Sequence, residues 1–283
     1  MRKFYLENEY AQRYALHQPG KVFFGNVSGL GTSANARYIS VGDVFLRDYM
    51  KSAQQPVVGT LYFLRGQNQY NSLRELVDFM YSAKNLKLIY SPDTGKNVEY
   101  VRDIDLTAIA KGEIDVDKVL RVPVEFKCKS LYYNTRQATF VVETSEEERI
   151  YNYRYPTRYN DHANKTMDFN NTGHVEAPIE AEIYGFSQNP KIEILQNGVV
   201  VRRVEFPVQI NTGEKLLYSS KDGDLYAYIE DGNGNQTNVS GELDLENDNF
   251  FKLPIGQCKI RVSSSFGVNN KIIIRTYKMY KVV

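Results

Sequence analysis

Residues 38–46 read Tyr-Ile-Ser-Val-Gly-Asp-Val-Phe-Leu. Two short runs rich in β-branched and aromatic residues flank the dipeptide Gly42-Asp43, whose composition is typical of a tight hairpin turn. A further apolar run, 57–64, follows the polar turn 51–56. The pattern predicts a long twisted hairpin over residues 38–64 that protrudes from its domain.

One later segment has helical rather than strand patterning. Ser72 to Glu75 has the sequence of a capping box, and the apolar residues that follow recur at helical spacing, namely Leu73, Leu76, Val77 and Met80. We predict a helix that begins at Ser72 and ends near residues 83–85. Strand-like runs lie on both sides of it, so the first part of the chain is expected to be mainly β with one α-helix.

The second half has a different pattern. An exposed acidic run at 143–149 marks the expected boundary, which gives domains at 1–145 and 146–283. Beyond it, short strand candidates alternate with dipeptides that favour tight hairpin turns: Asn197-Gly198, Asp222-Gly223, Asp231-Gly232 and Asn233-Gly234. With no helical periodicity, this half is predicted to be a β-sandwich or jelly roll.

Composition excludes several classes of protein. The formal net charge of +1 over 283 residues provides no basic excess for gripping nucleic-acid phosphates, so no nucleic-acid partner is expected. Charged residues near the start and the lack of any apolar run of about 18 residues predict synthesis in the cytoplasm without a signal peptide, and no membrane insertion. Cys128 and Cys258 lie in apolar contexts and are expected to be buried, reduced thiols.

One polar stretch has the spacing of a calcium-binding loop. Asp231, Asn233, Asn235 and Glu242 occupy its first, third, fifth and twelfth positions. The sixth position is Gln236, whereas the motif requires glycine there, so a polar hairpin tip is the favoured interpretation.

Other candidate groups lack the partners that chemistry requires. Two aspartate pairs occur at alternate positions, Asp103 with Asp105 and Asp115 with Asp117, and no recognisable motif supplies a third partner for either pair. The three histidines, at positions 17, 162 and 174, fit no metal-binding spacing. We therefore expect no catalytic residue, no cofactor and no metal, and a chain that is not an enzyme.

The chain holds 22 tyrosines and no tryptophan, and its densest aromatic cluster lies just past the expected boundary. It consists of Tyr151, Tyr153, Tyr155 and Tyr159, interleaved with two arginines. Such a cluster can stack on sugars or bases, or it can pack in a protein interface, where Tyr and Arg are enriched. We favour the second role, in which the tyrosines pack in a protein interface.

Several segments, in order along nearly the whole chain, resemble the distal tail proteins of long-tailed phages. In the second half these are Asn171 to Pro178 leading into 179–185, and Phe251 to Ile260 with its Leu-Pro turn. In the first half they are the opening residues Phe4, Leu6 and Asn8, the runs 61–63 and 86–92, and the stretches 122–126 and 131–133.

The resemblance implies a structural protein of the virion tail tip that assembles as a homohexameric ring with a central channel for DNA. Its N-terminal domain would be a β-sandwich-like belt, and its C-terminal domain a galectin-like β-sandwich. Implied partners are the tail tube protein, the tail-tip protein and receptor-binding or other baseplate proteins. The predicted hairpin supplies the expected subunit interface: Tyr38, Val41, Phe45, Leu46, Leu61 and Phe63.

Two other functions remain open from the sequence. A carbohydrate-binding module would use the galectin-like half and the clustered tyrosines to bind glycans. A tail-associated hydrolase would need an active site assembled from residues scattered along the chain.

Overall fold

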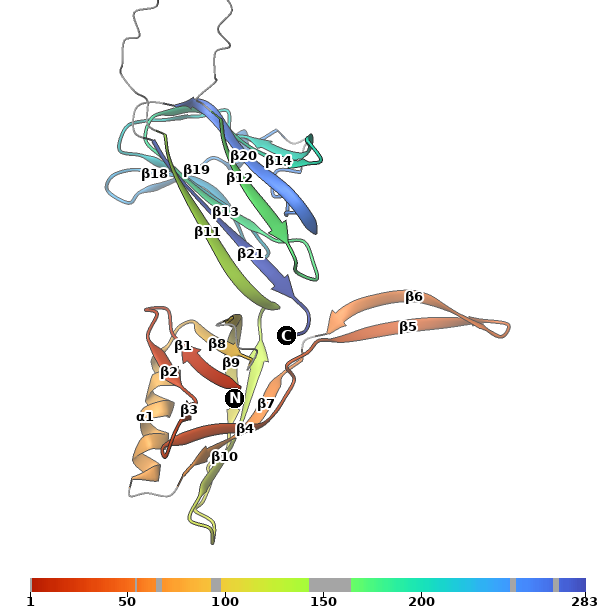
Figure 1. The fold of residues 1–283 in the computed structure, drawn as a ribbon, viewed down its shortest axis with the longest axis vertical. Helices are drawn as coiled ribbons and strands as arrows, with labels where there is room; N and C mark the ends of the chain where they lie inside the picture. Colours follow the sequence, from red (N-terminus) through yellow and green to blue (C-terminus); the bar gives the residue numbers. More distant parts are fainter. Residues whose placement is uncertain are drawn as a thin grey trace, which may run out of the picture. The chain divides into compact units, whose positions relative to one another are not determined.

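The chain divides into two compact units in the computed structural model (Figure 1). The model describes residues 2–53, 55–64, 68–92, 98–142, 164–244, 248–266 and 270–283. The first unit is Met1–Asn134 with Tyr280–Val283, and the second is Thr135–Met279. Strand β11 (Tyr132–Val142) begins in the first unit and ends in the second. The acidic run 143–149, where we placed the boundary, lies outside the described residues.

The first unit consists of strands and one helix. They are β1 (Lys3–Glu7), β2 (Arg13–Ala15), β3 (His17–Gln18), β4 (Val22–Ser28), β5 (Ser33–Val41), β6 (Val44–Ala53), β7 (Val57–Phe63), α1 (Gln69–Ser82), β8 (Leu86–Ser91), β9 (Tyr100–Ile109) and β10 (Leu120–Cys128). The main sheet is antiparallel, with strands in the order β2-β1-β8-β9-β10-β7-β4-β3, while β5 and β6 pair only with each other.

The main sheet of the first unit closes on itself through Leu16. This residue lies between β2, which pairs with β1, and β3, which pairs with β4. Its N–H donates to the carbonyl of Phe4, and its own carbonyl accepts from the N–H of Phe24, both at 2.8 Å. The rings of Phe4 and Phe24 meet edge to face inside, 5.3 Å apart. The expected sandwich-like first domain is therefore a single closed sheet.

Helix α1 covers this sheet with Leu76 and Met80, which are buried in the core of the first unit. The helix exists as predicted, but its start at Ser72 was wrong: it begins at Gln69, and no side chain caps its first turn. The buried amide of Gln69 instead lies within 2.8 Å of the carbonyls of Phe63 and Lys118. Because Ser72 is inside the helix, its capping box is not formed.

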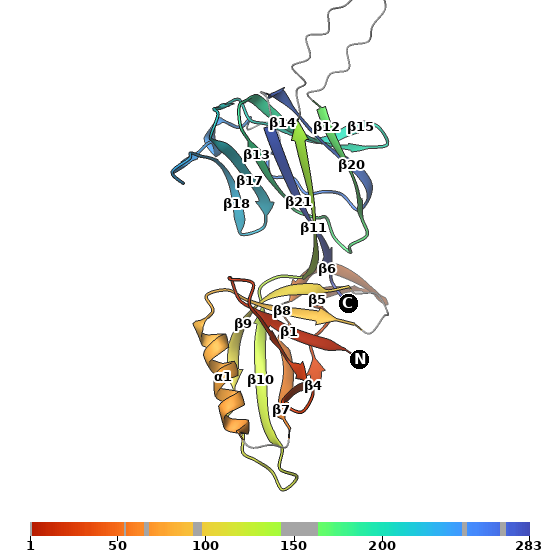
Figure 2. The same ribbon diagram turned by 60° about the vertical axis from the view of Figure 1, so that its left-hand side comes forward.

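The second unit consists of two antiparallel sheets around one core (Figure 2). Its elements are β12 (Asn164–Asn171), β13 (Ile179–Tyr184), β14 (Ser187–Gln196), β15 (Val199–Glu205), β16 (Gln209–Ile210), β17 (Lys215–Lys221), β18 (Asp224–Glu230), β19 (Gln236–Asn238), the 3-10 turn η1 (Ser240–Glu242), β20 (Gly256–Phe266) and β21 (Asn270–Tyr280). One sheet has the order β19-β18-β17-β13-β21-β11, and the other β12-β20-β14-β15 with β16 beside β14.

The predicted turns of the second unit are present. Asn197-Gly198 connects β14 to β15, and Asp222-Gly223 connects β17 to β18, each between directly paired residues. Tyr218 and Phe206 are fully buried between the sheets, with ring centroids 5.5 Å apart. In the part of the chain that is described, no helix has the length and apolar character needed to cross a membrane.

Candidate functional site

The most exposed apolar element of the first unit is the hairpin of β5 and β6, residues 33–53, which we call the hairpin arm. Val41 pairs with Val44 across Gly42-Asp43, as predicted. Gly42 has φ +62°, which suits a primed turn with glycine at its first central position. The arm is longer toward its base than expected, and a β-bulge shifts the pairing next to Arg37.

Both faces of the hairpin arm expose large apolar side chains. The register places Ile39, Val41, Val44, Leu46 and Tyr49 on one face. It places Tyr38, Phe45 and Met50 on the other. All eight are between 45% and 72% exposed. A two-stranded hairpin without other cover is at best marginally stable in water, so this arrangement calls for a partner surface.

The base of the hairpin arm is fixed by close packing. Gly29, with φ +84°, leads into β5, and a Cβ atom there would lie 1.9 Å from the carbonyl oxygen of Pro56, the residue before β7. The guanidinium of Arg102 donates to the carbonyls of Ser130, at 2.8 Å, and Gly29, at 3.4 Å. Arg102 is 3% exposed and lies over the ring of Tyr132. The arm thus leaves from a rigid base.

The structure corrects two of the predicted interface residues. Leu61 and Phe63 are 1% and 0% exposed, because β7 belongs to the closed sheet and directs them into its core. They are not part of the arm. Tyr38, Val41, Phe45 and Leu46 do lie on it, exposed. The predicted interface omitted Ile39 and Val44, although they continue the same apolar pattern around the turn. It also omitted Tyr49 and Met50, which lie beyond the β-bulge that shifts the alternation.

The tyrosine cluster predicted as a contact surface, Tyr151, Tyr153, Tyr155 and Tyr159, lies outside the described residues, as does His162. Nothing in the described structure bears on that prediction.

The loop with calcium-like spacing is closed by its own hydrogen bonds. The carboxylate of Asp231 accepts from the N–H groups of Asn233, at 2.8 Å, and Asn235, at 2.9 Å, and from the Asn235 amide. These bonds lower the pKa of Asp231, the side chain of Asn235 contributing most. Glu242 lies in η1, beyond β19. The loop is a polar hairpin tip, which is the interpretation that the sequence favoured over a calcium-binding loop.

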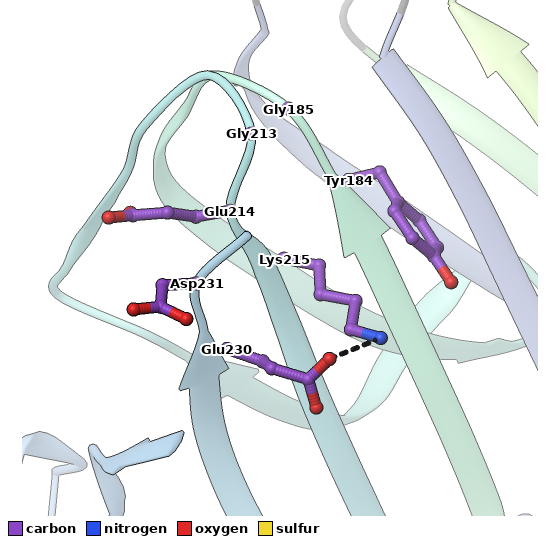
Figure 3. Close-up of a pocket in the computed structure, with 7 residues that line it drawn as sticks. All are labelled: Tyr184, Gly185, Gly213, Glu214, Lys215, Glu230 and Asp231. Atoms are coloured by element: carbon purple, nitrogen blue, oxygen red, sulfur yellow. Dashed lines mark ion pairs between the residues drawn. The ribbon is translucent and has the colours of Figure 1, made fainter. Parts of the chain in front are cut away.

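A pocket of about 380 Å³ beside this loop contains several charged groups (Figure 3). Lys215 and Glu230 form an ion pair of 2.7 Å across its wall. The hydrogen bond with Lys215 lowers the pKa of Glu230. Glu214 accepts from the N–H of Asn211 at 2.8 Å. Each of these charged groups is held by an ion pair or by hydrogen bonds within the unit, and the residues described around the pocket present no acid and base aligned for catalysis.

The two aspartate pairs are likewise held by neighbours. Arg121 bonds both Asp115, at 2.8 Å, and Asp117. Asp105 pairs with Lys129 at 2.9 Å, and Asp103 accepts from the hydroxyl of Tyr133 at 3.0 Å.

Metal-binding candidates are also few. His17 lies 3.1 Å from the carbonyl of Phe4 and edge-on to Tyr5. Within the described ranges, no group of three or more His, Cys, Asp or Glu side chains is placed to hold a metal ion.

Comparison with known families identifies the first unit. Residues 3–129 match the family model described as the distal tail protein, N-terminal domain. Residues 3–129 are a distal tail protein domain. The match spans the strands from β1 to β10, the helix α1 and the hairpin arm. This family is structural and not enzymatic, in agreement with the expectation that the chain is not an enzyme.

Two solved structures share the fold of the distal tail domain and extend the likeness to the second unit. One chain of the baseplate of phage P2, in its activated conformation with calcium, is 13% identical with a TM-score of 0.67 over 100% of both chains. The Dit protein of phage SPP1, described as a paradigm of hub adsorption apparatus in phages that infect Gram-positive bacteria, is 14% identical with a TM-score of 0.58, over 97% of this chain and 98% of that one. No curated protein sequence matches.

Identities this low establish the fold alone. The role follows from the family match: with its distal tail protein domain at residues 3–129, this chain is a structural component of a phage tail tip or baseplate.

Proposed function

We propose that this chain forms a homohexameric ring in the tail tip, which joins the tail tube to the tail-tip protein and leaves a central channel for DNA. The observation that carries the proposal is the hairpin arm, whose eight large apolar side chains are exposed in the single chain. Burying such a surface removes apolar area from water at roughly 25 cal/mol per Å². We propose that a second copy of this chain covers the apolar surface of the arm, because other copies are present wherever the chain is made.

The arm favours a head-to-tail contact over a two-fold one. Its strands leave one side of the unit, and each has an unpaired edge beyond its partner in the two-stranded sheet. Contacts between different surfaces of neighbouring subunits generate closed rings when the rotation between copies closes. The formal charge of +1 is also compatible with a channel that DNA passes without being held.

In this proposal, the first unit is the belt of the ring. The second unit, with its two sheets around one core, is a galectin-like β-sandwich or jelly roll that faces outward and anchors receptor-binding or other baseplate proteins. The SPP1 protein with this fold is described as a paradigm of hub adsorption apparatus, which supports such a role.

Light scattering on the purified full chain tests the ring. The expected mass is near six times the 32.6 kDa of one chain, with annular particles in negative-stain images. A chain that stays monomeric at the highest soluble concentration contradicts the proposal.

A further inference from the structure

We propose that the pocket beside the 231–235 loop of the second unit binds a sugar ring of a neutral oligosaccharide. The pocket has a volume of about 380 Å³ and lies where β13 ends, β17 begins and β18 ends (Figure 3). The site is additional to the proposed ring and does not depend on its formation. It contains none of the clustered tyrosines between 151 and 159 that the sequence offered for glycan binding.

The register of the sheet brings a charged pair and an aromatic ring together at the pocket. Lys215 lies directly opposite Glu230 on β18 and directly opposite Tyr184 on β13. Directly paired side chains share one face of a sheet, so all three reach the pocket from adjacent strands. The ammonium of Lys215 is 2.7 Å from the carboxylate of Glu230 and 5.6 Å from the centre of the Tyr184 ring. Figure 3 shows it between the two.

The charges around the pocket favour a neutral ligand. An anion would meet three carboxylates, those of Glu214, Glu230 and Asp231. A cation would find each of them engaged: Glu230 accepts from Lys215 and, at 2.9 Å, from the amide of Gln236. The other two accept from backbone N–H groups of neighbouring loop residues at 2.8–2.9 Å. A neutral ligand neither meets repulsion nor has to displace these bonds.

Hydroxyl groups can use the ion pair of Lys215 and Glu230 without breaking it. Each carboxylate oxygen has two lone pairs and an ammonium has three donors, so both groups retain hydrogen-bonding capacity after they pair. Neighbouring hydroxyls of a sugar can donate to the carboxylate and accept from the ammonium at the same time. The C–H groups of the sugar ring carry a small positive charge, which suits contact with the negative face of an aromatic ring such as Tyr184.

The outer face of the same sheet offers room for further sugar units. Two residues along each strand from the pocket, Tyr228, Leu217 and Glu182 form the next row on this face. The ring of Tyr228 stacks on that of Tyr226, with centroids 5.4 Å apart. Glu182 accepts from the hydroxyl of Tyr184, which links this row to the pocket. Aromatic rings and paired polar groups thus continue beyond the pocket, which favours an oligosaccharide over a single sugar.

Glycan binding by the full chain tests the proposal. An array of neutral and acidic oligosaccharides identifies a ligand, and calorimetric titration of the best neutral one gives its Kd. Glu230→Gln removes the charge at nearly constant size, and Tyr184→Leu removes the aromatic ring but keeps an apolar side chain. We expect each change to raise the Kd by roughly tenfold or more, because each removes one of the two contacts that hold the sugar ring.

Glu205→Gln is the matched control. Glu205 pairs with Lys191 at 2.9 Å across β14 and β15, in the same cross-strand arrangement but in the other sheet of the unit. This variant also loses an ion pair, and it should bind the oligosaccharide as the unchanged protein does. Thermal unfolding without ligand checks that each variant is folded. If Tyr184→Leu is not folded, Glu230→Gln and its control decide the outcome.

Several results would overturn the proposal. One is that no neutral oligosaccharide binds at millimolar concentration, and another is that Glu230→Gln binds as tightly as Glu205→Gln. Preference for acidic over neutral oligosaccharides would contradict the charge argument. If calcium chloride alone binds and Glu230→Gln abolishes that binding, the pocket is a cation site instead. None of these measurements depends on the mass of the assembly, so the site and the ring can fail separately.

Discussion

Gly29 lies against the backbone of Pro56 so closely that a Cβ atom at position 29 would be 1.9 Å from the carbonyl oxygen of Pro56. The first residue precedes the hairpin arm and the second follows it, so their contact closes the base of the arm. Gly29 also has φ +84°, a conformation that L-residues rarely adopt. Both the contact and the backbone therefore require glycine.

Replacing Gly29 with alanine should lower the free energy of unfolding of the first unit by roughly 2–4 kcal/mol, because the strained backbone and the steric clash add together. Gly20→Ala is the matched control, since Gly20 has φ +75° with no atom within 4 Å of the added Cβ. It should lose about 1–2 kcal/mol, from backbone strain alone. Urea unfolding followed by circular dichroism measures both. Equal losses would show that the contact with Pro56 contributes nothing.

Arg102 should also stabilise the packing at the base of the hairpin arm. Its buried guanidinium bonds the carbonyl of Ser130 at 2.8 Å and lies 4.9 Å from the centre of the Tyr132 ring. Lysine lacks the planar fork that makes these contacts, so Arg102→Lys is expected to reduce the free energy of unfolding by about 1–3 kcal/mol. Arg202→Lys, at an exposed position of β15, should change it by less than about 0.5 kcal/mol. Indistinguishable urea midpoints for the two variants would argue against this role.

The sequence predicts local structure well where a short motif determines it. Gly42-Asp43 identifies the turn of the arm, and the spacing of Leu76 and Met80 identifies the buried face of α1. The helix start was wrong because Gln69, a residue with no capping signature, binds carbonyls from two distant segments. Such long-range hydrogen bonds leave no mark in the local pattern.

Which strands belong to the arm is harder to predict from sequence. The alternation of residues in β7 directs Leu61 and Phe63 to the same face of the strand. It does not show whether that face contacts a partner subunit or the core of the unit, and in the structure it is the core. Closure of the sheet at Leu16 and the role of Gly29 also depend on segments far apart in the chain. The bulge opposite Arg37 shifts the alternation near the base, which concealed Tyr49 and Met50 as members of the arm.

The thiol of Cys258 should make stability depend on pH in the alkaline range. Burial raises its pKa from 9.0 to about 11. The unfolded chain loses this proton near pH 9, whereas the folded chain keeps it until near pH 11. The contribution of the neutral thiol is therefore fully present below pH 9, and the free energy of unfolding should fall as pH rises from about 9 to about 11.

Cys258→Ala removes this thiol while leaving every tyrosine and Cys128 in place, so the difference between the two proteins isolates its titration. Urea midpoints at several pH values between 8 and 11 should decline less steeply for the variant. Parallel curves would mean that the thiol of Cys258 titrates alike in the folded and unfolded chains.

Phe45 should matter for assembly and hardly at all for folding. Its side chain is 72% exposed in the single chain, so Phe45→Ser removes little buried surface and should leave the thermal unfolding of the monomer nearly unchanged. If the arm is buried between copies, each contact loses about 2–3 kcal/mol, which weakens assembly by more than roughly tenfold. Val199→Ser is the control, because Val199 is 65% exposed on β15 of the second unit. Light scattering during dilution should show the Phe45 variant dissociating first; if both variants dissociate together with the unchanged protein, the apolar surface of the arm does not hold the subunits together.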